Sequence, residues 1–355
     1  MKIVILQPSI PHYRSAFFNG LNSKVNYDLF SLDESHGDRS NLNKALIDYQ
    51  KLKVVKFWKF KWYNPFRLLL KYDVIVIPGE LSYLSNWLLL LMSRLLDKHI
   101  VVWGHGLNYS QNKPISIGYW LLYFLSKSAI FYTEKEMRFW RKKLSTKFMS
   151  FINNTVEINT NKVDHFYNTK NVSEVKRRHK ITHEKIFISC YRFTNLDRKD
   201  EDLFELIKKC ERTHRNVGFI IIGTGKLKPD FSGLTNVYDF GELYDSSQKL
   251  ELFFISDFYL QLGWTGLSIV EAFAHKKPVI TLKRSTNTKQ SVEYFYLKNN
   301  YNSIILNSIH DFDKVTLITK EKSAILSNNS FNSYVDNLNM NSMINNFKNH
   351  LNDIQ

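Results

Sequence analysis

GWTGLSIVEAFAHKK, residues 263–277, is followed directly by PVIT, residues 278–281. This order predicts a glycine turn, then a helix, then a buried strand. The start of a helix carries unpaired N–H groups and the positive end of the helix dipole, so a glycine turn there suits a bound phosphate or diphosphate. Glu271 lies one helical turn further on, where its carboxylate could hold a group attached to that phosphate.

Short β-branched runs alternate with helical patterns along almost the whole chain, which is typical of parallel α/β units. The predicted strands are 2–6, 27–30, 54–58, 74–77, 99–103, 129–132 and 147–151 in the first half, and 186–190, 217–222, 237–240, 258–260, 279–282 and 303–306 in the second. Ligands of open parallel sheets lie beyond the carboxyl ends of the strands. Two doubly wound sheets that face each other would therefore enclose a ligand cleft between two domains.

A polar, asparagine-rich segment around 153–185 interrupts this alternation and is the candidate hinge. With 355 residues, the chain is long enough for two domains. We predict an N-terminal Rossmann-like domain at 1–160, a linker at 161–184 and a C-terminal Rossmann-like domain at 185–335. A helical tail at 336–355 could pack back on the N-terminal domain.

The net charge of +16 and the pI near 9.5 indicate an acidic partner, which could be nucleic acid, an anionic membrane surface or a phosphorylated small molecule. The two cysteines, Cys190 and Cys210, are too few for a disulfide framework, and the opening MKIVILQPSI has a strand pattern rather than that of a signal peptide. No apolar run approaches the roughly 20 residues that cross a bilayer. These features predict a cytoplasmic protein.

Four segments of the second half resemble, in order and spacing, the nucleotide-sugar-binding domain of GT-B glycosyltransferases, and specifically of retaining glycosyltransferase family four (glycosyl transferases group 1). They are CYRFTNLDRKDEDLFELI (190–207), FIIIGTGK (219–226), NVYDFGEL (236–243) and GWTGLSIVEAFAHKKPVIT (263–281). The resemblance covers residues 186–294. It implies a GT-B fold, with two doubly wound Rossmann-like domains facing an interdomain cleft and the acceptor on the N-terminal side.

Arg192 and Lys199 match the phosphate-binding arginine and lysine of that family, and Arg198 competes for the second role. The resemblance implies that these cations act in catalysis, because breaking a sugar–diphosphate bond puts negative charge on the departing phosphates. The alternative interpretation is a solvated loop before a helix.

Two further parts of the motif would hold the donor. Gly223 and Gly225 resemble the family's turn beside the nucleotide base, although a Gly-x-Gly after a strand could also be only a tight turn. The resemblance implies that the diphosphate is bound by the backbone N–H groups of Thr265, Gly266 and Leu267.

Glu271 matches the second glutamate of the family's Glu-x7-Glu motif, whose carboxylate accepts hydrogen bonds from the ribose hydroxyls. Alternatively, it projects to solvent from an amphipathic helix. Gly263 stands where the first glutamate is expected, which leaves open how the donor sugar is held. Lys276 replaces the usual glycine at the end of the helix.

In the first half, QPSIPHYR (7–14) resembles the entry segment of a family subgroup, which implies that His12, Tyr13 and Arg14 face the acceptor. WGHG (103–106) looks like the family's histidine loop, which implies a catalytic His105 near the transferred sugar. The alternative is a structural histidine.

Residues 51–72, KLKVVKFWKFKWYNPFRLLLKY, interleave basic and aromatic side chains. This mixture suits an anionic membrane surface or single-stranded nucleic acid. The alternative is a strand at 59–62 with a solvated basic face and buried rings. The family resemblance favours the membrane, because many such transferases act on lipid-linked acceptors.

The resemblance therefore implies a retaining glycosyltransferase of cell-surface glycan synthesis (capsule, O-antigen or lipopolysaccharide). It would move a sugar from a UDP- or GDP-linked donor to a hydroxyl of a saccharide or lipid-linked saccharide. No cofactor, metal ion or nucleic-acid partner is expected, and Asp311-Phe-Asp313 is interpreted as a surface turn. The alternatives are a GT-B-fold nucleotide-sugar 2-epimerase and a basic nucleic-acid-binding protein. A peripheral location on the inner face of the cytoplasmic membrane is a further expectation.

Overall fold

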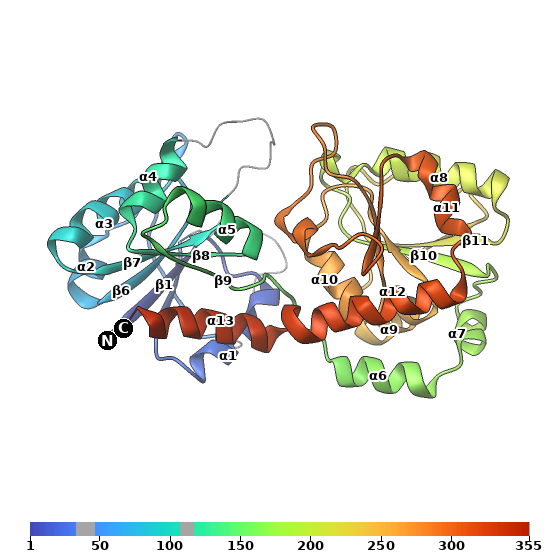
Figure 1. Ribbon diagram of the computed structural model, residues 1–355, viewed down its shortest axis with the longest axis horizontal. Helices are drawn as coiled ribbons and strands as arrows, with labels where there is room; N and C mark the ends of the chain where they lie inside the picture. The colour runs from blue at the N-terminus through green and yellow to red at the C-terminus, as the bar shows by residue number, and fades with distance from the viewer. Residues whose placement is uncertain (33–46, 107–116, 355) are drawn as a thin grey trace. The chain divides into compact units, whose positions relative to one another are not determined.

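The computed structural model describes residues 1–32, 47–106 and 117–354. They form two compact units, each built around one large parallel sheet (Figure 1). The first unit contains the described residues up to Glu157 together with the C-terminal segment that begins at Met340. The second unit contains Ile158–Asn339.

Within the described residues, the first unit holds a seven-stranded parallel sheet in the order β3-β2-β1-β6-β7-β8-β9. Its strands are β1 (Ile3–Gln7), β2 (Asp28–Ser31), β3 (Gln50–Lys51), β6 (Val74–Pro78), β7 (His99–Gly104), β8 (Ser128–Phe131) and β9 (Phe148–Phe151). Its helices before the C-terminal segment are η1 (His12–Arg14), α1 (Ser15–Asn22), α2 (Phe66–Lys71), α3 (Leu84–Leu95), α4 (Ile117–Leu125) and α5 (Glu134–Lys143). The central strands β1 and β6 are buried along their whole length and are apolar except for Gln7, as expected for a sheet with both faces covered.

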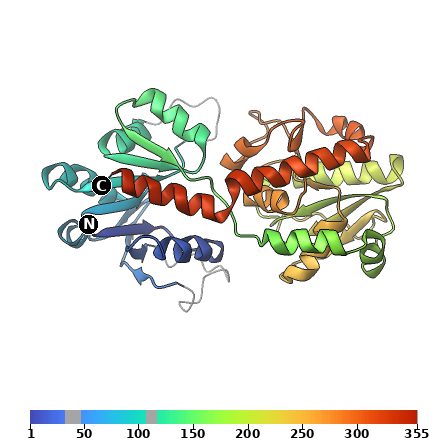
Figure 2. The ribbon, with the colours of Figure 1, turned by 60° about the horizontal axis from the view of Figure 1, so that its bottom comes forward.

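The C-terminal helix α13 (Met340–Asp353) packs beside α1 in the first unit (Figure 1, Figure 2). The ring of Phe347 lies 5.4 Å from the ring of Phe17 and 5.0 Å from that of Trp103. Gly20 allows α1 and α13 to approach closely, because a Cβ atom at this position would overlap the side chain of Ile344. The tail is therefore part of the first unit's core.

The basic aromatic segment forms a separate antiparallel hairpin of β4 (Val55–Phe57) and β5 (Phe60–Trp62). Its rings are exposed, with exposed fractions of 78% for Phe57, 80% for Trp58 and 39% for both Phe60 and Trp62. The alternative interpretation, a strand at 59–62 with buried rings, is therefore wrong. Instead, Lys61 turns toward the unit, where its Nζ lies 3.4 Å from the hydroxyl of Tyr83.

Within the described residues, the second unit holds a six-stranded parallel sheet in the order β12-β11-β10-β13-β14-β15. The strands are β10 (Lys185–Cys190), β11 (Val217–Ile222), β12 (Val237–Asp239), β13 (Phe258–Leu260), β14 (Val279–Leu282) and β15 (Ser303–Leu306). The helices are α6 (Thr160–Thr169), α7 (Val172–Arg178), η3 (Leu196–Arg198), α8 (Asp200–Thr213), α9 (Ser246–Ile255), α10 (Leu267–Ala274), η4 (Val292–Tyr296), η5 (Ile309–Asp311), α11 (Phe312–Thr316), α12 (Lys320–Ser333) and the π-helical η6 (Tyr334–Leu338).

The strand order places β11 and β13 on opposite sides of β10, so the winding of the second sheet reverses between β10 and β13. In doubly wound sheets, ligands bind beyond the strand ends at this reversal point. The first sheet has the same arrangement, with β2 and β6 on opposite sides of β1.

The segment 161–184, which we expected to be a linker, contains α6 and α7 and belongs to the second unit. Its asparagines have a local role, because the side chains of Asn159 and Asn171 cap the two helices. None of the described helices combines the length and the apolar character needed to cross a bilayer.

Candidate functional site

The GWTG turn connects β13 to α10 at the reversal point of the second sheet. Gly266 is the N-cap residue of α10 and provides no side chain to bond the first turn. Within the described part of the chain, the N–H groups of Gly266 and Leu267 have no hydrogen-bond partner, and both residues are partly exposed. The start of α10 can therefore donate hydrogen bonds to an anion.

The backbone N–H of Thr265, which we predicted to bind the diphosphate, is not available as a hydrogen-bond donor to a ligand. Its N–H donates to Oε1 of Gln290 at 2.9 Å, so this N–H is already used within the protein. The Oγ1 atom of Thr265 is buried and has no hydrogen-bond partner. The donor that Thr265 still has is thus its side-chain hydroxyl.

Two buried glutamines hold the turn in place. The Nε2 atom of Gln261 donates to the carbonyl of Trp264 at 2.9 Å, and its Oε1 accepts from Ser268 at 2.7 Å. Gln290 accepts from Thr265 and donates to the carbonyl of Leu282 at 3.0 Å. Sequence reasoning missed both residues. Gln261 could have been found as a lone amide within the apolar run FYLQL, whereas nothing local marks Gln290.

The loop that follows β10 packs directly against the turn. The N–H of Gly263 donates to the carbonyl of Arg198 at 3.1 Å. A Cβ atom at position 263 would overlap the carbonyl oxygen of Asp197 and would lie 2.9 Å from Cγ of Lys199. No side chain fits at position 263, which explains why the glutamate expected from the resemblance is absent.

The two competing cations of this loop occupy different places. Lys199 has a left-handed backbone with φ of 65°, and its Nζ lies 3.7 Å from the carboxylate of Asp202. Its side chain passes next to Gly263. The guanidinium of Arg198 instead lies 5.0 Å from the ring centroid of Tyr191. The side chain of Lys199 and the backbone of Arg198 thus both lie beside the turn, and which of the two cations binds phosphate stays a prediction. Arg192 is exposed just beyond the end of β10.

Gly223 and Gly225 are required by backbone packing. Their φ angles are +135° and +152°, and Cβ atoms there would overlap the carbonyl oxygens of Tyr191 and Phe193. The N–H of Phe193 also donates to the carbonyl of Thr224 at 2.9 Å. The tight-turn interpretation thus accounts for both glycines, and a role beside a nucleotide base stays a prediction.

Glu271 forms an ion pair with Lys249 of α9, with 2.6 Å between Oε1 and Nζ. Their side chains are only 19% and 23% exposed, so Glu271 does not project to solvent. Lys249 was not predicted as a site residue, because nothing in the helical stretch SSQKLELFFI distinguishes it from any surface lysine.

In the first unit, His105 lies just beyond the end of β7, with 49% of its side chain exposed. Its Nδ1 is 3.8 Å from Oε1 of Glu136, and its ring centroid is 4.3 Å from that of Tyr132. Glu136 is fully buried, and its Oε2 accepts from the N–H and hydroxyl of Thr133 at 3.0 and 2.9 Å. A fixed carboxylate therefore faces one nitrogen of His105.

The three residues predicted to face an acceptor differ in exposure. His12 and Tyr13 are exposed, whereas Arg14 is buried. The Nη2 atom of Arg14 donates to Oδ1 of Asn154 at 2.7 Å, and the guanidinium lies 5.7 Å from the ring centroid of Trp103. The charge of Arg14 is thus used inside the first unit, and a place of these three residues beside an acceptor stays a prediction.

Across the described residues, no group of three or more His, Cys, Asp or Glu side chains is placed to hold a metal ion. The carboxylates of Asp311 and Asp313 form ion pairs instead. Asp311 lies 2.9 Å from Nζ of Lys314, and Asp313 lies 2.7 Å from Nζ of Lys209.

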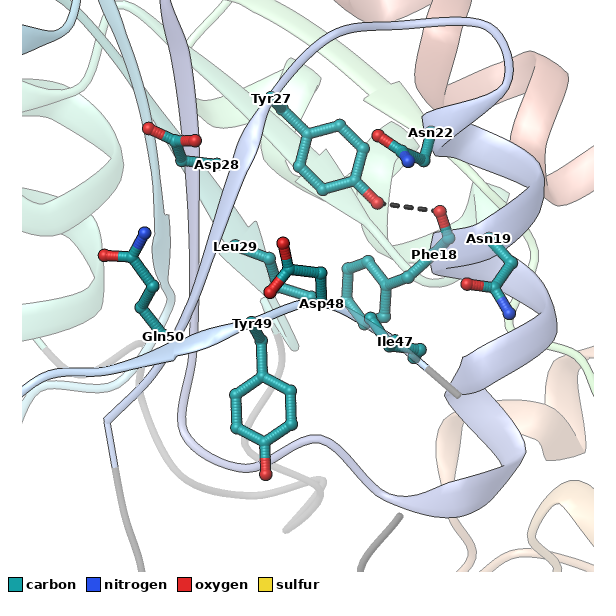
Figure 3. A pocket seen from close by; sticks show the side chains of 10 residues that line it. All are labelled: Phe18, Asn19, Asn22, Tyr27, Asp28, Leu29, Ile47, Asp48, Tyr49 and Gln50. Atoms are coloured by element: carbon teal, nitrogen blue, oxygen red, sulfur yellow. Dashed lines mark hydrogen bonds between the residues drawn. The ribbon is translucent and has the colours of Figure 1, made fainter. Parts of the chain in front are cut away.

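A pocket in the first unit lies between α1 and the starts of β2 and β3 (Figure 3). Its lining includes Tyr27, whose hydroxyl donates to the carbonyl of Phe18 at 2.7 Å, and the carboxylates of Asp28 and Asp48. No predicted site residue lines it. Because Asp28 is the first residue of β2, the pocket is not at the strand ends where parallel sheets bind ligands.

No protein-family model matches the sequence, and no curated protein matches it. Solved structures match over the whole chain. A glycosyltransferase from Rickettsia africae is 14% identical, with a TM-score of 0.65 over 100% of this chain and 98% of that chain. The lipopolysaccharide outer core galactosyltransferase WaaB is 15% identical, with a TM-score of 0.65 over 100% of both chains. A mutant of S. aureus TarM in complex with UDP is 12% identical, with a TM-score of 0.60 over 99% of both chains.

The likeness and the two parallel sheets confirm the predicted fold class. Each unit is doubly wound and Rossmann-like. The chain has the GT-B fold, which is the fold of these glycosyltransferases.

Proposed function

We propose that the protein is a retaining glycosyltransferase that moves a sugar from a nucleoside diphosphate donor to a hydroxyl of a saccharide or lipid-linked saccharide. The observation that carries the proposal is the start of α10, whose N–H groups at Gly266 and Leu267 are uncapped at the reversal point of the second sheet. Lys199 packs against the turn that leads to it. The GT-B fold and the UDP bound to a TarM mutant support the same assignment.

In this proposal, the protein stabilises the leaving diphosphate. Arg192, Lys199 and the start of α10 offset the negative charge that develops when the bond between sugar and diphosphate breaks. The acceptor hydroxyl forms the new bond on the face that the diphosphate leaves, and a donor phosphate oxygen takes its proton. We assign the positioning of the sugar to His105 from the family resemblance, and we assign no metal ion or cofactor.

We extend the proposal to cell-surface glycan synthesis, such as that of capsule, O-antigen or lipopolysaccharide. One structural neighbour is a lipopolysaccharide outer core galactosyltransferase. A screen of UDP- and GDP-linked sugars for donor hydrolysis, followed by transfer assays with the best donor, tests this assignment.

UDP or GDP should raise the melting temperature of the protein, because a ligand that binds only the folded state stabilises it. Arg192→Ala and Glu271→Ala should abolish most of this rise in a thermal-shift assay. Arg212→Ala and Glu205→Ala are matched controls, because they remove exposed charges of α8. Both controls should keep the rise in melting temperature. A wild-type protein that responds to no nucleoside diphosphate would refute the donor site.

We also propose that the β4–β5 hairpin binds an anionic membrane surface peripherally, at the inner face of the cytoplasmic membrane. The exposed rings of Phe57 and Trp58 and the ammonium of Lys59, 4.9 Å from the Trp58 ring centroid, form an aromatic and basic tip. Aromatic and basic side chains are favoured together at the headgroup layer.

Replacing Lys56, Lys59 and Trp58 together by alanine should lower binding to phosphatidylglycerol vesicles by more than about tenfold, since each basic residue contributes about 1 kcal/mol near an anionic surface. Lys61 is left intact because it contacts Tyr83. Vesicle sedimentation measures the change, and Tyr244→Ala, which removes a ring that is 79% exposed in the second unit, is the control. Unchanged binding by the triple variant would contradict the proposal.

A further inference from the structure

The ion pair between Lys249 and Glu271 joins α9 to α10 at the reversal point of the second sheet. The thiol of Cys190, the last residue of β10, lies close to the Lys249 ammonium and interacts with it. Burial alone would lower the pKa of Lys249, but the Glu271 carboxylate and the Cys190 sulfur outweigh burial and raise it. Lys249 therefore keeps its positive charge at neutral pH.

Lys249 binds only one of the two carboxylate oxygens of Glu271. Its Nζ is 2.6 Å from Oε1. Among the described residues, Oε2 has no hydrogen-bond partner. The ion pair therefore fixes the carboxylate from one side and leaves an acceptor oxygen on the other.

Glu271 and Leu267 are four residues apart, so they lie on the same face of α10. The N–H group of Leu267 is one of the two uncapped donors at the start of the helix. Four residues rise about 6 Å along a helix axis, which is the scale of a ribose attached to a phosphate. A nucleoside diphosphate bound at the start of α10 would thus bring a ribose hydroxyl to Glu271.

We propose that Lys249 is a positioning residue that holds Glu271 by Oε1, so that Oε2 accepts a hydrogen bond from a ribose hydroxyl of the bound nucleoside diphosphate. This inference rests on the proposed donor site. It makes the pair a device for recognising ribose, whereas a purely structural pair would only join α9 to α10. The two roles differ in what happens to the preference for ribonucleotides over 2′-deoxy- and 3′-deoxynucleotides.

The experiment compares the affinities of UDP and GDP with those of their 2′-deoxy and 3′-deoxy forms by calorimetry. Lys249→Met keeps the length of the side chain and removes its charge, and Lys249→Arg keeps the charge. Lys209→Met is the matched control, because Lys209 forms an ion pair with Asp313 at 2.7 Å, close to the 2.6 Å of the Lys249–Glu271 pair, between other helices of the same unit.

The wild type should prefer the ribonucleotide over at least one deoxy form by about tenfold or more, the size expected for a hydrogen bond to a charged group. Lys249→Met should bring that ratio of affinities close to one, because it should lower the affinity for the ribonucleotide and leave the affinity for the deoxy forms unchanged. Lys249→Arg and Lys209→Met should keep the ratio. In the Glu271→Gln variant, the additional substitution Lys249→Met should produce no further loss of the preference for the ribonucleotide.

A Lys249→Met variant with the wild-type ratio, or with all affinities lowered equally, overturns the inference and leaves the donor site standing. Absence of any nucleoside diphosphate binding to the wild type overturns both. The melting temperature without ligand shows whether Lys249→Met is folded. If it is not, Lys249→Gln, which keeps a polar group near Glu271 without the charge, is measured against the same criteria.

Discussion

A glutamate at position 263 should lower the free energy of unfolding by about 3 kcal/mol or more and abolish the response to nucleoside diphosphates, although the family resemblance expects a glutamate there. A Cβ atom at this position would overlap the carbonyl oxygen of Asp197 and lie 3.2 Å from the carbonyl carbon of Arg198. These are backbone atoms, which cannot rotate away as a side chain can. The loop that carries Lys199 would have to move. Urea unfolding gives the loss of stability, and a thermal-shift assay with UDP and GDP gives the loss of binding.

Gly266→Ala is the matched control in the same turn. A Cβ atom at position 266 would meet nothing within 4 Å, so this variant should lose less than about 1 kcal/mol. If Gly263→Glu were as stable as Gly266→Ala, the loop after β10 would not pack against Gly263. Stronger nucleotide binding by Gly263→Glu would contradict the steric explanation in the same way.

Acid should loosen the attachment of α13, because a buried, neutral histidine holds that helix to the first sheet. The Nε2 atom of His350 lies 3.0 Å from Oγ of Ser128, and its Nδ1 lies 2.7 Å from Oγ of Ser150. Nε2 of His99 lies 2.9 Å from the same Ser128 hydroxyl. Burial lowers the pKa of His350 to about 3, and burial together with nearby Lys127 lowers the pKa of His99 to about 4.

The direction of the pH effect follows from these lowered values. A histidine of the unfolded chain has a pKa of about 6.5, so below that pH the unfolded state binds protons that the folded state does not. The stability from neutral His350 is complete above pH 6.5 and is lost progressively as the pH falls toward 3. At pH 5 the loss from His350 amounts to about 2 kcal/mol.

His350→Gln removes this titration and should lower stability at pH 7.5, while reducing the further loss between pH 7.5 and pH 5 by about 2 kcal/mol. His310→Gln, at an exposed position of η5, should leave both quantities unchanged. Urea unfolding at the two pH values measures the difference. An acid loss in His350→Gln equal to that of the wild type would show that His350 does not carry the effect.

Strands buried on both faces were predicted well from the sequence. The bounds of β11, β13 and β14 agree with the predicted strands 217–222, 258–260 and 279–282, because largely apolar runs between polar loops are a local signal. The edge strand β3 was not predicted, since its two polar residues, Gln50 and Lys51, carry no pattern. The predicted strand 54–58 exists as β4, but it belongs to the exposed hairpin rather than to the parallel sheet.

The residue type at the end of α10 does not follow from the local backbone conformation alone. Lys276 has a φ of 60°, the left-handed conformation that favours the glycine usual at that position. Its Nζ lies 2.6 Å from the carboxylate of Asp164 and 4.7 Å from the ring centroid of Phe331. Lys276, which stands in the place of the usual glycine, therefore makes contacts with residues that are distant in the sequence.

The sequence by itself determined the alternation of strands and helices, the position of the glycine turn before α10 and the placement of Glu271 one turn into that helix. These features depend on residues a few positions apart, so periodicity and turn chemistry reveal them. Only the tertiary structure decided that Gly263 has no room for a side chain, that Lys249 holds Glu271 and that Arg14 is buried. Each of these features depends on which segments the order of the strands brings into contact. Contacts between residues that are far apart in the chain have no local sequence pattern, so the sequence alone does not reveal them.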